Sequence, residues 1–127
     1  MDENQVLRQI AAQRARNQGL LKALAGHGVA LDEPRSTDHH FHVKTSSRVK
    51  SLSAGLLRFG FENLHHHKTG ALLWQSHSVE AKFTGSPNLI SGDRFVEDIV
   101  RLAARHESTY DGWGTSLGRP AAPPPKA

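Results

Sequence analysis

The stretch Thr37-Asp38-His39-His40-Phe41-His42-Val43-Lys44 decides how this chain can fold. Apolar and polar side chains alternate along it, which is the pattern of a strand with one face buried and one face in water. One face carries His39, Phe41 and Val43, and the other carries Asp38, His40, His42 and Lys44. The stretch therefore predicts a half-buried β-strand. Because it lies beside two apolar side chains, His39 is predicted to be a hydrogen-bonded core histidine rather than a catalyst.

A helix and a second strand are predicted directly after this strand. Residues 45–47 supply a helix start, and apolar side chains then recur at helical spacing as far as Phe59. Gly60 is well placed just past the end of that helix. Residues 61–67 then predict the second strand.

The remaining chain predicts a third strand, a second helix and a closing strand. A tight connection at residues 68–70 leads into a long strand over residues 71–83. A loop over residues 84–91 follows, with Ser91 as the cap of the next helix. The apolar face of that helix comprises Val96, Ile99, Val100 and Ala103. Residues 109–117 form the last extended segment.

The N-terminal segment is rich in good helix formers over residues 2–25 and predicts one helix or two short ones. Two apolar patches, one around Val6 and one around Leu24, are separated by the polar residues Gln13, Arg14, Arg16 and Asn17. Several side chains of this segment are basic and form a solvated face or, alternatively, a docking arm. They are Arg8, Arg14, Arg16 and Lys22.

The order strand, helix, strand, strand, helix, strand predicts two strand–helix–strand units with right-handed crossovers. We therefore expect an α+β fold, a ferredoxin-like βαββαβ sandwich whose four-stranded antiparallel sheet carries both helices on one face. The extra N-terminal helix could cover part of the other face. Three parts are expected: a helical segment over residues 1–28, the ferredoxin-like domain over residues 29–118, and a disordered tail over residues 119–127. That tail holds four of the six prolines.

Length and composition exclude several classes of protein. A chain of 127 residues has room for one domain, and the lack of cysteine excludes disulfides, a thiolate nucleophile and cysteine-ligated zinc. The net charge of +4 permits a nucleic acid or an acidic protein surface as partner without requiring either. The sequence contains neither a membrane-spanning apolar run nor a signal-peptide pattern, so a cytoplasmic protein without a membrane partner is expected.

The most specific stretch is Tyr110-Asp111-Gly112-Trp113-Gly114-Thr115. Strict alternation along a strand would place Tyr110, Gly112 and Gly114 on one face and the other three side chains on the opposite face. One interpretation makes this the closing strand, with Tyr110 and Trp113 as packing anchors. The other places Asp111 and Trp113 at an exposed edge as part of a partner contact, where tryptophan and tyrosine contribute most.

The chain resembles the RraB-like family, the B-type regulators of ribonuclease E activity, over residues 20–117. The closing Tyr110–Thr115 stretch carries most of this resemblance. Supporting pieces are Gly28, the Pro34-Arg35 turn, Asp38-His39-His40, the Leu56–Phe61 helix end with Gly60, and Leu102-Ala103.

The resemblance implies a ferredoxin-like fold and a non-enzymatic role. Such a protein binds ribonuclease E, or its degradosome scaffold, and lowers its activity on messenger RNA. The predicted partner-binding residues are Asp38, His40, Tyr110, Asp111, Gly112, Trp113, Gly114 and Thr115. The chain departs from the acidic character of the family in its basic charge and its Pro-rich end.

A histidine-bound metal is one alternative, because the chain has nine histidines. On strands, His40 and His42 point the same way, as do His65 and His67, so paired ligands can form. By alternation His77 faces the helices and does not share the face of His40 and His42 unless a β-bulge intervenes. Surface histidines are the preferred interpretation, and no metal or other cofactor is predicted.

Direct RNA binding is the second alternative, since the ferredoxin-like sheet and the basic charge are those of RNA-recognition modules. The stretch Arg58-Phe59-Gly60-Phe61 is similar to part of their signature, but it falls at a helix end, and Trp74 is the open-face aromatic to consider. Catalysis is not predicted. The sequence has no Gly-x-Ser-x-Gly stretch, and the adjacent Glu97 and Asp98 diverge on a helix among arginines.

Overall fold

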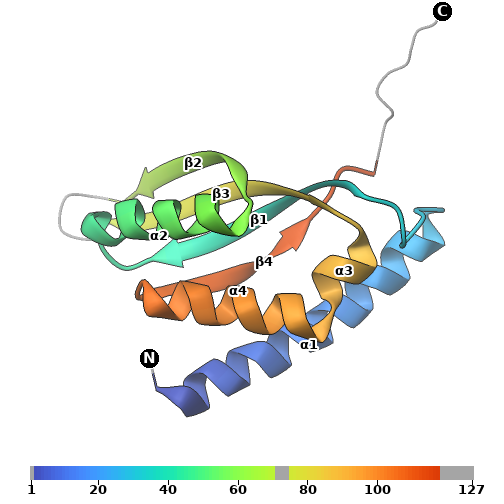
Figure 1. Ribbon diagram of the computed structural model, residues 1–127, viewed down its shortest axis with the longest axis horizontal. Helices are drawn as coiled ribbons and strands as arrows, with labels where there is room; N and C mark the ends of the chain where they lie inside the picture. Colours follow the sequence, from blue (N-terminus) through green and yellow to red (C-terminus); the bar gives the residue numbers. More distant parts are fainter. Residues whose placement is uncertain (1, 71–74, 118–127) are drawn as a thin grey trace, which may run out of the picture.

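Eight helices and strands follow one another along the described residues, 2–70 and 75–117, of the computed structural model (Figure 1). They are α1 (Glu3–Gly26), β1 (Arg35–Val43), α2 (Ser46–Phe59), β2 (Glu62–Thr69), β3 (Ser76–Gly85), α3 (Pro87–Ser91), α4 (Asp93–Arg105) and β4 (Ser108–Gly114). The predicted order of strands and helices is confirmed, with α1 as one continuous helix before it. The tail predicted over residues 119–127 lies outside the described residues.

The four strands form one antiparallel sheet in the order β2-β3-β1-β4. The unit β1-α2-β2 places its two strands on either side of β3, and the unit β3-α4-β4 places its two strands on either side of β1. Two crossover units thus interleave within a single sheet. The predicted α+β class is confirmed, and the strand order fits the predicted ferredoxin-like arrangement.

One face of the sheet is covered by helices and the other is open. α2 packs on β1, β2 and β3, while α4 lies beside it and packs against β4 (Figure 1). The alternation predicted along β1 is confirmed. The odd-numbered residues from Thr37 to Val43 are buried under the helices, whereas His40 and His42 are exposed on the open face. Val79 and Ala81 of β3 extend the buried face into the core.

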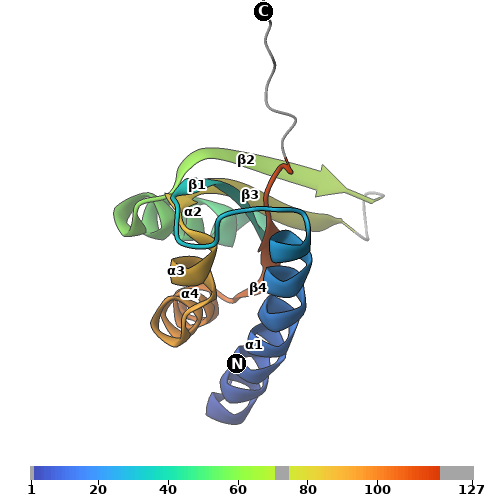
Figure 2. The same cartoon turned by 90° about the vertical axis from the view of Figure 1, so that its right-hand side faces the viewer.

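The long helix α1 packs against α4 and α3 and runs along the β4 edge of the sheet, so it leaves the open face uncovered (Figure 2). Its buried residues are Val6, Ile10, Gln13, Asn17 and Leu24, at spacings of three, four or seven that place them on one helix face. Of the polar residues that separate the apolar patches in the sequence, Gln13 and Asn17 therefore belong to the packed face itself, whereas Arg14 and Arg16 are exposed.

Two predicted connections differ from the structure. β2 continues to Thr69, so the tight connection predicted at residues 68–70 is wrong, and residues 71–74 of the predicted third strand lie outside the described part of the chain. The loop predicted over residues 84–91 contains α3. Pro87 occupies the first turn of α3, and the Ser86 hydroxyl accepts a hydrogen bond from the backbone N–H of Leu89.

The cap predicted for the second helix is also wrong, because Gly92 rather than Ser91 precedes α4. Ser91 is taken into the end of α3, which sequence periodicity did not reveal. The predicted apolar face of α4 is confirmed, since its four residues are buried. Among the described helices, none has the length and apolar character needed to cross a membrane.

Candidate functional site

The Tyr110–Thr115 stretch departs from strict alternation through a β-bulge. Tyr110 lies opposite Phe41 and Trp113 lies opposite His39, so two residues of β4 face one residue of β1. Gly112 provides the bulge, with a φ of 105° that side chains other than hydrogen rarely adopt. The faces predicted for this stretch are therefore wrong, because the extra residue turns both Tyr110 and Trp113 toward the helices.

A chain of three hydrogen bonds holds His39 in the core. The Thr37 hydroxyl donates to the carbonyl oxygen of Phe83 at 2.7 Å, so it must accept from Nε2 of His39 at 2.8 Å. Nδ1 of His39 then accepts from the Tyr110 hydroxyl at 2.7 Å. Both ring nitrogens have partners, and the ring is fully buried. The prediction of a hydrogen-bonded core histidine is confirmed.

The pKa values of this buried pair are shifted away from ionisation. Burial, and secondarily the charge of His40, lower the pKa of His39 to about 3. Burial also raises the pKa of the Tyr110 hydroxyl well above its usual range. Both groups are therefore neutral at pH 7. Two of the sequence pieces that carry the family resemblance, Asp38-His39-His40 in β1 and Tyr110–Thr115 in β4, are joined by the hydrogen bond of this pair.

The side chain of Asn17 connects α1 to the bulge of β4 through hydrogen bonds. Its Oδ1 accepts hydrogen bonds from Nε1 of Trp113 at 3.0 Å and from Nε2 of Gln13 at 2.9 Å. Because the indole N–H can only donate, the orientation of the Asn17 amide is fixed. Its Nδ2 is buried and has no hydrogen-bond partner among the described residues. Arg16 adds a second hydrogen bond between α1 and β4, since its Nη1 donates to the carbonyl oxygen of Asp111 at 2.9 Å.

These groups border a hollow of about 360 Å³ between α1 and β4, here called the α1/β4 pocket. From α1 it is lined by Gln13, Arg16, Asn17 and Leu20. From the sheet it is lined by His40, Asp111, Gly112, Trp113 and Gly114. Five of the eight predicted partner-binding residues thus come together at one place. His40 and Asp111 are exposed there, whereas Trp113 is buried and forms part of the wall.

The other three predicted residues lie apart from the pocket lining. Asp38 forms an ion pair with Lys82 of β3 on the open face, and this contact raises the pKa of the Lys82 ammonium. Tyr110 is in the core with His39. Thr115 accepts a hydrogen bond from Nε of Arg35 at 3.1 Å and donates to the carbonyl oxygen of Ser36 at 2.8 Å.

Sequence reasoning did not select the α1 side of the pocket. Gln13 and Asn17 occupy the third and fourth places of a regular series of inward positions that starts at Val6 and Ile10. Following that spacing through polar residues would have identified them, because buried polar side chains on a helix face require partners. Arg16 offers no such signal, since arginines on helices are commonly solvated.

Comparison with known proteins identifies the family of this chain. The family described as "Regulator of ribonuclease activity B" (RraB) matches residues 14–115. The chain belongs to the RraB family. The matched region of this RraB member includes Asn17 and Arg16 of α1 and ends at Thr115, so it contains both sides of the α1/β4 pocket except Gln13.

Individual RraB relatives are distant but match over most of their length. The chain is 24% identical over 112 residues to a "Regulator of ribonuclease activity B" of Shewanella denitrificans, covering 85% of this chain and 84% of the relative. It is 24% identical over 110 residues to the protein of the same name in Photobacterium profundum, covering 84% and 82%. A third such protein, of Shewanella amazonensis, is 25% identical over 112 residues, covering 85% and 77%.

The histidines on the strands of this RraB member take the faces predicted for them. His65 and His67 are exposed on β2, while His77 is buried on the helix side and its Nδ1 lies 3.1 Å from Nε2 of His66. Within residues 2–70 and 75–117, no group of three histidine or carboxylate side chains is arranged to hold a metal ion. The aromatic residue considered for RNA stacking, Trp74, lies outside the described residues.

Proposed function

We propose that this chain regulates RNA decay without catalysis, by binding a protein of the decay machinery in the cytoplasm. Ribonuclease E, or a component of its assembly, is the proposed partner. Membership of the RraB family supports the regulatory role, because the relatives are named for regulating ribonuclease activity. We further propose that the exposed rim of the α1/β4 pocket, with His40 and Asp111, is the contact surface.

The observation that carries this proposal is the pocket itself. The bulge and the hydrogen bonds to Asn17 and Arg16 of α1 hold Trp113 and Asp111 in fixed positions at the edge of the sheet. A preformed surface loses little conformational entropy when a partner binds, which favours recognition. The buried Nδ2 of Asn17, a residue of the pocket lining, adds a donor that a partner's carbonyl oxygen would satisfy after a small side-chain shift.

The chemistry of the buried pair supports a non-catalytic role. His39 and Tyr110 are the titratable groups whose pKa values are most strongly perturbed by burial, a property often found at catalytic sites. Here both nitrogens of His39 already have protein partners, and the ring has no access to solvent. The pair therefore stabilises the strand contact between β1 and β4 and has no free nitrogen to exchange a proton with a substrate.

The test is the rate at which purified ribonuclease E cleaves a single-stranded RNA in the presence of this chain. We expect the wild-type chain to slow cleavage in a saturable way. The double variant His40→Ala/Asp111→Ala should need roughly tenfold more protein for the same effect, because two rim contacts are removed. His65→Ala is the matched control, as an exposed histidine on the edge strand farthest from β4.

Two outcomes would reject the proposal. If the wild-type chain leaves the cleavage rate unchanged and forms no complex with the enzyme, the proposed partner is wrong. If cleavage slows only because the chain binds the RNA, a gel shift with RNA alone will show the complex, and direct RNA binding replaces protein contact. That binding would weaken steeply with salt.

A further inference from the structure

A second hollow, here called the α2/α4 groove, lies between the two helices that cover the sheet. It has a volume of about 290 Å³ and is lined by Gly55, Arg58, Phe59, Leu102, Arg105 and His106. The absence of a side chain at Gly55 lets His106 approach α2, because a Cβ there would lie 3.0 Å from Nε2 of His106. The groove shares no lining residue with the α1/β4 pocket.

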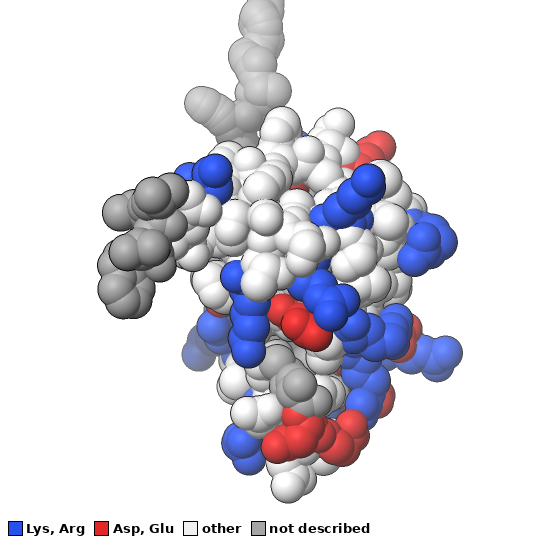
Figure 3. All heavy atoms as spheres, turned by 90° about the vertical axis from the view of Figure 1, so that its left-hand side faces the viewer, with Lys and Arg blue, Asp and Glu red and all other residues white. Residues whose placement is uncertain are grey.

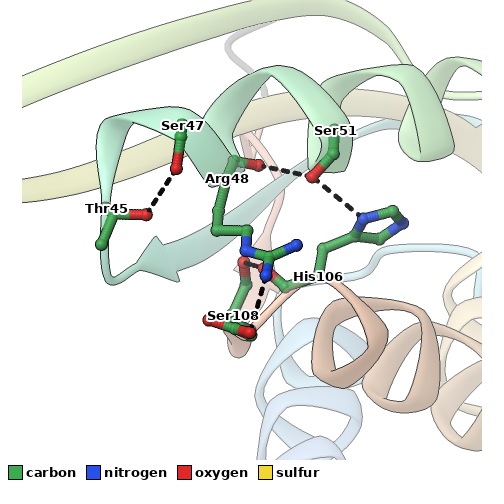
Figure 4. A network of polar contacts seen from close by, with 7 residues as sticks. Thr45, Ser47, Arg48, Ser51, His106 and Ser108 are labelled. Atoms are coloured by element: carbon green, nitrogen blue, oxygen red, sulfur yellow. Dashed lines mark hydrogen bonds and ion pairs between the residues drawn. The ribbon is translucent and has the colours of Figure 1, made fainter.

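Hydrogen bonds fix the protonation of His106, whose ring points across from the end of α4 toward Ser51 of α2 (Figure 4). Oγ of Ser51 donates to the carbonyl oxygen of Arg48 at 3.2 Å, so it accepts from Nδ1 of His106 at 3.2 Å. Nε2 is then the unprotonated nitrogen, and it faces Gly55. The neutral ring forms one wall of the groove.

The groove carries two cations that have no acidic partner among the described residues. Burial and then the guanidinium groups of Arg105, Arg58 and Arg48 lower the pKa of His106, which places three cations around the ring. Arg48 has an acidic partner, since its Nη2 lies 2.8 Å from Oε2 of Glu107. Within the described residues, Arg58 and Arg105 have neither an ion pair nor a side-chain hydrogen bond.

Other arginines of the helix layer are paired with carboxylates. Arg14 lies 3.0 Å from Asp93, and Arg101 lies 2.9 Å from both Glu3 and Glu97. Figure 3 views the molecule from the end at which α4 finishes. On that face Lys and Arg side chains gather in the middle and along one side, with one acidic group among them and a larger acidic group at the bottom.

We propose that the α2/α4 groove binds a short acidic segment of a protein partner. Two carboxylates of the segment would pair with Arg58 and Arg105, whose planar guanidinium groups suit bidentate contact. Phe59 and Leu102 are the apolar residues of the lining, here called the apolar floor, so an apolar side chain of the segment would pack against them. The proposal adds a second surface to the proposed function and rests on it only in that the partner is a protein.

The shape of the groove favours an acidic peptide over RNA. A single-stranded RNA is bound along an extended basic track, with exposed aromatic rings on which successive bases stack. Of the two rings that line the groove, that of Phe59 is half-buried and in contact distance of Phe61, Phe83 and Phe95, and that of His106 is hydrogen-bonded to Ser51. Two cations without acidic partners beside an apolar floor match two carboxylates near one apolar side chain.

The experiment is a fluorescence-polarisation titration of the full chain with a labelled peptide of glutamates around one central leucine. We expect saturable binding that weakens roughly tenfold or more in Arg58→Ala/Arg105→Ala, because two charge-assisted contacts are lost. The matched control is Arg8→Ala/Lys22→Ala, which removes the same charge from exposed positions of α1. That control should change the affinity less than twofold at 0.15 M salt, where distant charges are screened.

Two further probes test the chemistry of the ligand. Serine in place of the central leucine should weaken binding severalfold, since the apolar floor loses its contact. A labelled oligouridylate of similar length should bind more weakly than the acidic peptide. Equal loss of peptide binding in the groove variant and the α1 variant would overturn the proposal in favour of non-specific attraction. Tighter binding of the RNA, with the same dependence on Arg58 and Arg105, would make the groove a nucleic-acid site instead.

This titration is independent of the ribonuclease assay, so the two proposals can fail separately. Peptide binding at the groove with no effect on ribonuclease E would overturn the proposed partner and keep the groove. Slowed cleavage by the wild-type chain and no peptide binding even at low salt would overturn the groove and keep the proposed function.

Discussion

The α1/β4 pocket and the α2/α4 groove differ in where their polar side chains are directed. In the pocket, Asn17 and Arg16 pair with groups of β4, so their hydrogen bonds hold the fold together. In the groove, Arg58 and Arg105 have no such partners among the described residues. In the pocket the polar side chains stabilise the fold through hydrogen bonds, whereas in the groove the guanidinium groups are available to bind a ligand. Substitutions should therefore affect stability in the first region and binding or titration in the second.

The largest effect is expected for Trp113→Ala in the pocket wall. The substitution removes a buried indole and deprives Asn17 of one of its two donors, so the free energy of unfolding should fall by about 3–5 kcal/mol. Urea denaturation followed by circular dichroism measures it. Arg105→Ala in the groove should change the same quantity by less than about 0.5 kcal/mol. Similar losses in both variants would remove the contrast between the two regions.

Acid should destabilise the pocket side through His39. The folded chain holds this ring at a pKa of about 3, whereas the ordinary value is 6.5, so the unfolded chain binds more protons between these pH values. The contribution of neutral His39 to the free energy of unfolding is therefore complete above pH 6.5. As the pH falls toward 3, this contribution declines by at most about 1.4 kcal/mol per pH unit. In His39→Gln the stability gap from wild type should therefore shrink over that range.

Urea denaturation at a series of pH values measures this gap. His42→Gln, on the exposed face of the same strand, is the control and should follow the wild type throughout. A His39→Gln curve that runs parallel to the wild-type curve from pH 7 to pH 4 would contradict the assignment of a neutral, buried ring.

Gly112 and Gly114 offer a matched pair within the same strand. Gly112→Ala forces a side chain into a positive φ and within 2.9 Å of Arg16, and should cost about 1–2 kcal/mol. Gly114→Ala meets no atom within 4 Å and should change stability by less than about 0.5 kcal/mol. Thermal unfolding of the two variants compares them directly. Equal effects would show that the bulge does not depend on Gly112.

The smallest effect on stability is expected for substitutions in the groove, which should instead change the titration of His106. Arg58→Ala/Arg105→Ala removes two of the cations that lower the pKa of His106, so that pKa should rise toward its ordinary value while the fold is unchanged. NMR titration of the His106 ring protons measures it. The variant Arg8→Ala/Lys22→Ala should leave the His106 titration as in the wild type. An unaltered pKa in the groove variant would show that the two guanidinium groups do not act on the ring.

The helix-facing side of β1 was predictable from the sequence because its pattern is local. Alternation along residues 37–44 identifies His39 as a core residue without knowledge of its partners, and the structure supplies those partners. The apolar face of α4 was predictable for the same reason, since helical spacing is visible within a dozen residues.

The features that make up the pocket were not predictable in this way. The bulge depends on a positive φ at Gly112, which strict alternation cannot express, and it moves Trp113 to the opposite face. Asn17 is buried because it meets the Trp113 indole, 96 residues further along the chain. The groove likewise depends on arginines of two helices that the tertiary fold brings together around His106. The spacing of these residues in the sequence does not indicate that they meet.

Isothermal titration of purified ribonuclease E with the full chain tests most directly whether this protein acts by contact with another protein. We expect saturable binding by the wild-type chain, roughly tenfold weaker binding by His40→Ala/Asp111→Ala, and wild-type affinity for His65→Ala. No heat of binding at micromolar concentrations, or equal affinity in all three proteins, would contradict a partner surface at the rim of the α1/β4 pocket.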